Sequence, residues 1–208
     1  MSWRRWRKCP DLIPLFCKDA MSSIRGNTST TAKDQGIAYR LHIQLLDIEP
    51  AIWREVIVPA SIKLPVLHHV LQIAMGWDDG HMHDFAFDGT RYGGDGRREA
   101  GVALPDALGT KRSFEYTYDF GDDWRHAIKV NKVDKLDPAR RLPFCVDGER
   151  ACPPEDVGGP WGYANYLEAI GDPSHEEHED MLEWGGDFDP EEFDLKQINR
   201  ELAGIRLL

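Results

Sequence analysis

The sequence predicts an α+β fold in a single domain, because segments with strand periodicity come first along the chain and segments with helix periodicity follow. The 208 residues can bury one sizeable core, and no change of composition within residues 37–208 indicates a second. We therefore expect a mainly antiparallel sheet with a central aromatic hairpin, one early helix and a C-terminal group of helices.

Residues 1–36 differ from the rest of the chain in charge. They carry seven Lys/Arg against three Asp/Glu, whereas the whole chain has a formal net charge of −11. The apolar patch at Leu12 to Cys17 is too short for a secretory signal, which needs about 7 to 15 apolar residues. We predict a flexible basic and polar extension at 1–36, or a start placed too early with Met21 as a second start, before an α+β domain at 37–208.

Two strands and a helix open the predicted domain. Apolar and polar residues alternate from Tyr39 to Leu45, and a second strand is expected from Trp53 to Val58, after a turn with Pro50. Pro65 suits the first turn of a helix, and Gly76 ends it. The helix has apolar residues at helical spacing: Leu67, Val70, Leu71 and Ala74.

A further strand and the clearest hairpin follow. The strand is expected at His81 to Phe87, and the glycine-rich segment Gly89 to Gly109 is expected to be a long loop. Aromatic residues then alternate with polar ones from Phe114 to Phe120, Gly121-Asp122 suits a turn, and alternation resumes from Trp124 to Val130. We expect this hairpin to be central in the sheet, with its aromatic face inward.

The segment Glu149 to Tyr163, named the Pro/Gly loop here, suits neither a helix nor a strand. Two adjacent prolines fix φ and remove two amide donors, while Gly158-Gly159 permit positive φ. Glu155 and Asp156 place two carboxylates in this rigid segment. We predict a rigid acidic cap that brings both carboxylates near the Asp122-Asp123-Trp124 end of the sheet.

Three helices are expected after the Pro/Gly loop. The first runs from Tyr163 to Ile170 and ends at Gly171. Ser174 and Glu177 form a capping box that opens the second, which ends at Gly185. Asp194 and Gln197 open the last in the same way, and its apolar face consists of Leu195, Ile198, Leu202 and Ile205.

The acidic charge of the domain limits its partners. Sixteen Asp/Glu and one basic residue, Arg150, lie from Asp147 to Asp194. Because phosphate backbones bind Lys and Arg, we do not expect nucleic acid to bind the acidic core, and the expected partner is a small molecule or a protein. No apolar run reaches the roughly 18 residues of a membrane span, and four cysteines without an export signal indicate reduced thiols in a cytoplasmic protein.

Polar residues near the hairpin turn form a candidate recess. His81 and His83 would lie on one side of a strand, a spacing that can serve a divalent metal; alternatively, both are hydrogen-bonded in the sheet or exposed. The candidate recess comprises His81, His83, Asp119, Asp122, Asp123, Arg125, His126, Glu155 and Asp156.

Cys145 and Cys152 are further candidate metal ligands, with His175 or His178 to complete a site. Six residues separate the two cysteines, which is wider than the usual two to four of a zinc site, so buried thiols that anchor the loop are the alternative. His175 and His178 lie at i and i+3, and the zinc proteases require i and i+4.

Several motifs occur in order and together resemble the Ri-plasmid ORF-3-like family over residues 37–202. They are Ile48 to Arg54, Leu67-His68, Met75 to Trp77, His81 to Phe85, Tyr118 to His126, Arg150 to Tyr163, and Asp187 to Pro190. The resemblance implies a compact α+β domain found on plasmids, on prokaryotic chromosomes and as a passenger of transposable elements, without an established activity. Related sequences can carry a Cys where this chain has Val157, so the resemblance does not favour a thiolate metal site here.

Three kinds of function are weighed from these observations. The leading hypothesis is a non-catalytic binding or interaction module, because no complete nucleophile or phosphate-binding motif is present. The alternative is a metal-dependent hydrolase or nuclease-like enzyme with Glu155 or Asp156 as base. It would use His81, His83, Asp119, Asp122 and Asp123. A purely structural role would instead make Asp119 and Asp123 turn and cap acceptors paired with Arg54 and Arg125. Some relatives carry a resolvase-like label, but no recombinase catalytic set is visible, so a recombination accessory role ranks last.

Overall fold

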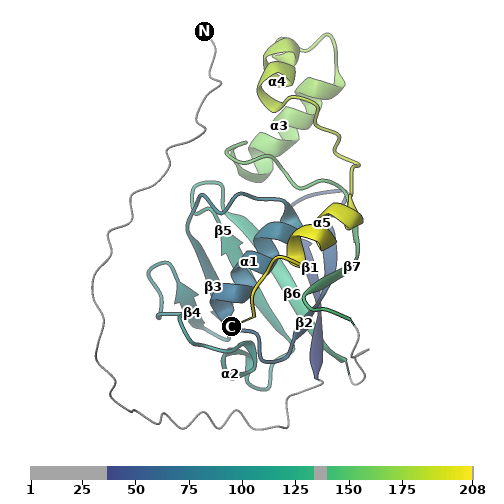
Figure 1. Ribbon diagram of the computed structural model, residues 1–208. Coiled ribbons are helices and arrows are strands. Elements are labelled where there is room, and N and C mark those ends of the chain that lie inside the picture. Colours follow the sequence, from purple (N-terminus) through teal and green to yellow (C-terminus); the bar gives the residue numbers. More distant parts are fainter. Residues whose placement is uncertain (1–36, 134–139, 208) are drawn as a thin grey trace, which may run out of the picture. The chain divides into compact units, whose positions relative to one another are not determined.

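The computed structural model describes residues 37–133 and 140–207, so the predicted extension at 1–36 lies outside the described residues (Figure 1). A seven-stranded antiparallel sheet has the order β4-β3-β5-β6-β1-β2-β7. Its strands are β1 (Ala38–Leu45), β2 (Trp53–Pro59), β3 (His83–Phe87), β4 (Thr90–Gly93), β5 (Ser113–Tyr118), β6 (Trp124–Val133) and β7 (Phe144–Glu149). The helices are α1 (Leu64–Met75), α2 (Leu104–Leu108), α3 (Gly159–Gly171), α4 (His178–Gly185) and α5 (Leu195–Leu202).

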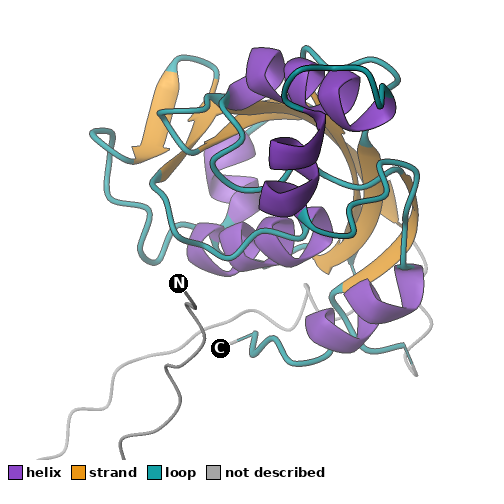
Figure 2. Cartoon of the chain, turned by 90° about the horizontal axis from the view of Figure 1, so that it is seen from above, coloured by secondary structure: helices purple, strands orange, loops and turns teal. Residues whose placement is uncertain are grey.

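This arrangement confirms the α+β fold class. Helix α1 packs on β2, and α5 lies against α1 and β7. Figure 2 shows the sheet as a curved layer with helices gathered against it. In the part of the chain that the structure describes, no helix has the length and apolarity needed to cross a membrane.

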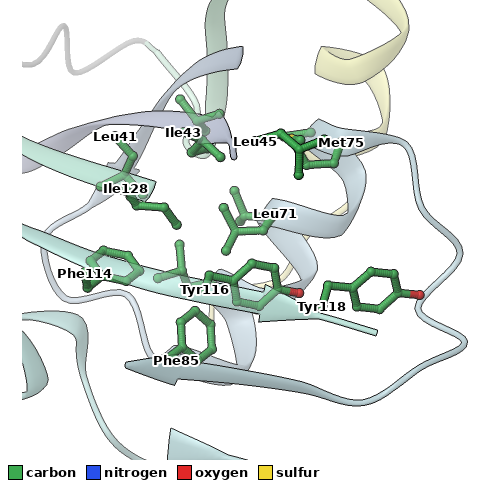
Figure 3. Close-up of a cluster of buried hydrophobic side chains, with 14 of the residues drawn as sticks. Leu41, Ile43, Leu45, Leu71, Met75, Phe85, Phe114, Tyr116, Tyr118 and Ile128 are labelled. Carbon is green, nitrogen blue, oxygen red and sulfur yellow. The ribbon is translucent and has the colours of Figure 1, made fainter. Parts of the chain in front are cut away.

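The aromatic hairpin is central and faces inward, as predicted. Strands β5 and β6 occupy the third and fourth positions of the seven-stranded order, and Tyr116 pairs with His126 across them. Tyr116, Tyr118 and Trp124 are fully buried. Figure 3 shows Leu71 of α1 close to Tyr116 within this core. Phe120 is the exception in the predicted alternation, because 42% of its surface remains exposed.

The hairpin turn is wider than the predicted two-residue turn. Strand β5 ends at Tyr118 and β6 begins at Trp124, so five residues connect them. Asp119 and Asp123 both adopt φ of 54°, and the Asp123 amide donates to the Asp119 carbonyl at 2.7 Å. Aspartate tolerates left-handed backbone better than most residues, which explains why this turn does not require glycine there.

Three short elements were not predicted from the sequence. Strand β4 and helix α2 lie within Gly89 to Gly109, so the prediction of a continuous loop was wrong. Gly89, with φ of 82°, makes the tight turn from β3 to β4, and Pro105 begins α2. Strand β7 pairs with β2 at the edge of the sheet. None of the three segments shows a clear hydrophobic period in its sequence.

The boundaries of the later helices differ in part from the predictions. Helix α3 begins at Gly159 with Pro160 in its first turn, four residues before the predicted start. The capping box of Ser174 was wrong, because its amide and hydroxyl bond the Asp172 carboxylate in a turn before α4. Asp194 caps α5 as predicted, accepting from the amides of residues 196 and 197. The Gln197 side chain bonds Glu201 and does not complete a capping box.

One buried arginine joins β2, the end of α1 and the start of the Pro/Gly loop. Arg54 Nε donates to the Ala74 carbonyl at 2.9 Å, and Nη1 donates to the Trp53 and Glu149 carbonyls at 2.8 and 2.7 Å. Nη2 donates to the Arg150 carbonyl at 2.7 Å. No carboxylate of the described residues lies in ion-pair range, so backbone dipoles stabilise this charge, and the predicted ion-partner role of Arg54 was wrong.

Replacement of Arg54 by lysine tests whether this guanidinium holds the three segments together. Lysine has three donors without the planar fork, so at least one buried carbonyl loses its partner. We expect Arg54→Lys to lower the free energy of unfolding by about 3 kcal/mol, measured by urea titration with tryptophan fluorescence. Arg40→Lys is the control, because the exposed Arg40 pairs with Glu55 and should change stability by less than about 0.5 kcal/mol. Similar losses in both variants would contradict the assignment.

Two buried histidines predict sensitivity to acid. Burial lowers the pKa of His68 and of His126 from 6.5 to about 4. Between pH 6.5 and 4, the unfolded chain therefore binds more protons than the folded chain. The contribution of the two neutral histidines to the free energy of unfolding is complete above pH 6.5 and is lost as pH falls toward 4. The loss reaches about 1.4 kcal/mol per pH unit for each histidine. Histidine-selective NMR of the native protein should show both rings neutral at about pH 5.5, and titration of either ring near its ordinary pKa would contradict this.

Candidate functional site

Two loops meet at one end of β5. The segment between α1 and β3 binds the Pro/Gly loop, since Trp77 Nε1 donates to the Pro153 carbonyl at 3.0 Å. The Asp78 amide donates to Glu155 Oε1 at 2.9 Å. Tyr118, at the end of β5, donates to the same carboxylate oxygen at 3.0 Å. Chain segments more than seventy residues apart therefore form one surface.

His81 lies among three carboxylates on this surface. Its Nε2 is 3.3 Å from Asp156 Oδ1 and 3.6 Å from Glu155 Oε2, and its Nδ1 is 3.6 Å from Asp119 Oδ2. We name His81, Asp119, Glu155 and Asp156 the acidic recess. Asp119 is almost fully buried, whereas 74% of the Asp156 side chain is exposed, so the recess opens to solvent on the Asp156 side.

One oxygen of Asp119 and one oxygen of Glu155 accept hydrogen bonds from neighbouring segments. The Gly121 amide donates to Asp119 Oδ1 at 2.8 Å, and Glu155 Oε1 accepts the two bonds described above. Burial and the bond to Glu155 raise the pKa of Tyr118, so its phenol remains a proton donor. The other oxygens, Asp119 Oδ2 and Glu155 Oε2, lie 3.6 Å from the His81 ring nitrogens, and Glu155 Oε2 also lies 3.4 Å from the Tyr118 hydroxyl.

His83 and His126 lie outside the recess. Strand β3 begins at His83, so His81 belongs to the preceding loop and the two imidazoles do not share a strand face. His83 Nε2 lies 3.1 Å from Glu99 Oε2, and its ring stacks on His68 at 3.5 Å. His126 is completely buried in the core.

The remaining predicted residues support the loops or face away. Asp122 Oδ2 accepts from the Gly158 amide at 3.0 Å and ties the Pro/Gly loop to the hairpin turn. Asp123 lies 3.6 Å from Arg125, which also pairs with Asp47. Arg125 follows the buried Trp124 on β6, so its side chain lies on the opposite face of the sheet.

The cysteines lie among structural contacts. Cys145 Sγ contacts the Asp147 carbonyl at 3.5 Å, and Cys152 Sγ contacts Arg54 Nη2 at 3.4 Å. Burial raises the pKa of Cys145 to about 11 and raises that of Cys152, which keeps both thiols protonated. Across 37–133 and 140–207, the groups spaced for a metal contain neither cysteine, and His178 binds the Ala169 carbonyl instead.

A second histidine cluster was not predicted as a site from the sequence. His68 Nε2 is 2.6 Å from Asp79 Oδ1, and His69 Nδ1 is 3.4 Å from Asp79 Oδ2. His68 Nδ1 also bonds the buried Tyr116 hydroxyl at 2.8 Å. The sequence signal that could have identified this cluster is an aspartate-rich turn that follows a helix with two adjacent histidines. A separation of 2.6 Å is that of a short hydrogen bond, so this contact supports the turn.

A groove adjoins the acidic recess between α3 and α4. Its volume is about 350 Å³, and it is lined by Asp156, Val157, Gly162, Asn165, Tyr166, Glu177, Met181 and Trp184. Asp156 belongs to both the groove and the recess. Helix α4 has no buried residue, and 49% of the Trp184 surface is exposed. Figure 1 shows α3 and α4 beside each other at one end of the described domain.

Comparison with known proteins identifies relatives of this fold. The chain is 41% identical over 178 residues to the uncharacterized protein y4hQ of Sinorhizobium fredii, covering 80% of this chain and 91% of that protein. The crystal structure of MM3350, a protein of unknown function from Methanosarcina mazei Go1, is similar with a TM-score of 0.72 and 37% identity. That similarity covers 77% of this chain and 97% of the other.

The sequence model described as plasmid pRiA4b ORF-3-like protein matches residues 37–197. This match covers most of the chain, and it includes β1 through the first turn of α5 and therefore every residue of the acidic recess. The chain belongs to the plasmid pRiA4b ORF-3-like protein family.

Proposed function

We propose that this protein is a non-catalytic binding module that docks a polypeptide segment in the groove between α3 and α4, with a cation held in the acidic recess. The observation that carries the proposal is the position of Asp156, which lines the groove and faces His81 in the recess. An apolar surface and a charged site therefore form one continuous docking surface.

The groove has the side chains of an interaction surface. Tyr166, Met181 and Trp184 supply aromatic and thioether walls, residue types that are enriched in protein interfaces. Leu182 and Trp184 of α4 expose 42% and 49% of their surfaces. An eight-residue helix without a buried residue gains little from its own core, so a partner that covers this face would stabilise it.

The recess contains no lysine or arginine. Among the described residues, the ion-pair contacts of Asp119, Glu155 and Asp156 involve only His81. Carboxylates held this close to one another repel, and a cation removes that repulsion. Docking at this end of the groove is therefore expected to depend on a cation.

A metal-dependent hydrolase is the second candidate, because His81, Asp119 and Asp156 offer ligand atoms within 4.8 Å of one another. The larger hydrolase set predicted from the sequence does not converge. His83 binds Glu99, and Asp122 holds the Gly158 amide, so neither is available to the recess. Binding without catalysis is the better supported function.

The proposal also includes a cellular location for this protein. The free thiols of Cys145 and Cys152 support the predicted cytoplasmic location. The association with plasmids and mobile elements that the resemblance implies remains a prediction. Accessory function in recombination is less favoured, because the segment around the groove holds sixteen acidic residues and one basic residue between Asp147 and Asp194.

Peptide selection tests the docking surface. A random peptide library is selected on the immobilised full chain, and the dissociation constants of the selected peptides are measured by fluorescence anisotropy. We expect Trp184→Ala to raise these constants at least about tenfold, since a buried aromatic contact contributes more than about 1 kcal/mol. Trp161→Ala is the control, because Trp161 is 85% exposed on α3 and does not line the groove. Failure to select peptides, or equal effects of both variants, would overturn the proposal.

Gly162 tests the link between α3 and the Pro/Gly loop. A Cβ at Gly162 would lie 2.0 Å from the Val157 carbonyl oxygen, so Gly162→Ala must displace Val157 and the adjoining Asp156. We expect this variant to bind the selected peptides at least about tenfold more weakly. In Gly171→Ala, which adds a Cβ to open space at the end of the same helix, affinity should be unchanged. Unchanged affinity in Gly162→Ala would show that this loop position does not contribute.

A further inference from the structure

We propose that the cation of the acidic recess is a divalent transition-metal ion bound by His81 Nε2, Glu155 Oε2 and Asp156 Oδ1, with Asp119 orienting the imidazole from its Nδ1 side. The inference rests on the proposed function in one respect, since it names the cation that the docking surface requires. The metal site itself depends only on the geometry of these four residues.

The separations measured from His81 Nε2 suit neighbouring ligands of one metal ion, and His81, Asp119 and Asp156 offer ligand atoms within 4.8 Å of one another. His81 Nε2 lies 3.6 Å from Glu155 Oε2 and 3.3 Å from Asp156 Oδ1. Metal–nitrogen and metal–oxygen bonds of about 2.0–2.2 Å place neighbouring ligand atoms roughly 3–3.5 Å apart. The observed separations are longer than ordinary hydrogen bonds, so these groups face one another without a direct bond.

Asp119 lies on the Nδ1 side of the imidazole, where a carboxylate can orient a metal-binding histidine. Histidines that bind metals commonly donate their other ring N–H to a carboxylate, which selects the tautomer and fixes the ring. Asp119 Oδ2 faces His81 Nδ1, while Asp119 Oδ1 is occupied by the Gly121 amide. A proton on Nδ1 leaves the lone pair of Nε2 directed toward Glu155 and Asp156. Without a cation, that lone pair and two carboxylates repel one another.

Glu155 is likewise positioned as a ligand. Its Oε1 accepts from the Asp78 amide at 2.9 Å and from the Tyr118 hydroxyl at 3.0 Å, while Oε2 lies 3.4 Å from the same hydroxyl and 3.6 Å from His81 Nε2. Asp156 has a φ of 59°, so its side chain leaves the loop from a left-handed backbone position. Each ligand therefore comes from a segment whose local conformation is fixed by other contacts.

The donor set selects the class of metal. One imidazole nitrogen with two carboxylates suits Zn²⁺, Co²⁺ or Mn²⁺, whereas Mg²⁺ and Ca²⁺ prefer oxygen ligands alone. Asp156 is the most exposed ligand and lines the groove, so a free coordination position faces the docking surface. A carboxylate of a docked peptide is the chemistry that this position would accept.

Metal titration of the full chain tests the site. Protein treated with EDTA and dialysed is titrated with Co²⁺ by visible absorption and with Zn²⁺ by calorimetry. We expect one ion per chain, and His81→Ala should weaken binding at least about 100-fold. His42→Ala is the control and should leave affinity unchanged, because His42 stacks on Trp53 and belongs to neither group of described residues spaced for a metal.

Asp119→Asn separates orientation from ligation. Asparagine keeps a side-chain oxygen for the Gly121 amide and tolerates the φ of 54°, but it removes the charge beside Nδ1. We expect roughly 10- to 100-fold weaker Co²⁺ binding with an altered absorption spectrum. Thermal unfolding of each variant in EDTA verifies that the fold is retained.

Three results would overturn the metal inference: no saturable binding of Co²⁺ or Zn²⁺, equal affinity for Mg²⁺ and Zn²⁺, or binding that is lost in His42→Ala and kept in His81→Ala. The proposed function fails separately. If selected peptides bind equally well in EDTA to a metal-free chain, the docking function stands and the metal inference fails. If the metal binds as expected but no peptide is selected, the metal site stands and the docking function fails.

Discussion

The buried guanidinium of Arg54 connects β2 with the end of α1 and the start of the Pro/Gly loop. It binds the carbonyl of Ala74 near the end of α1 and the carbonyls of Glu149 and Arg150 at the start of the Pro/Gly loop. The segment that carries His81 follows α1, and the segment that carries Glu155 follows Glu149 and Arg150. A lysine cannot reach as many carbonyls from one position, so arginine at this buried site determines that the two loops leave the core side by side.

Contacts of Trp77 and Asp122 then hold the two loops together at the acidic recess. Trp77 packs on Tyr118 at 5.0 Å between ring centroids and donates to the Pro153 carbonyl, which holds the loop after α1 against the Pro/Gly loop. Asp122 fixes the far end of the Pro/Gly loop through the Gly158 amide. The carboxylates are thus ordered before any ligand arrives, and an ordered cluster of like charges favours a cation strongly.

Much of the fold was predictable because periodicity is a local property. Alternation placed β1, β2, β5 and β6 correctly, and Asp194 marked the start of α5 through its side-chain cap. The edge strands β4 and β7 and the helix α2 were missed, because these segments show neither a clear alternation of apolar and polar residues nor a full helical repeat. The hairpin turn was placed correctly but was longer than predicted, because aspartate replaces glycine at its left-handed positions.

The sequence by itself determined the family resemblance, the fold class and the residue types from which a site could be made, including His81, Asp119, Glu155 and Asp156. Only the tertiary structure decided which of these meet. The start of β3 at His83 separates two histidines that alternation would pair, and His83 binds Glu99 instead. The physical reason is that convergence of His81 with Glu155 depends on hydrogen bonds between distant segments, which no local pattern records.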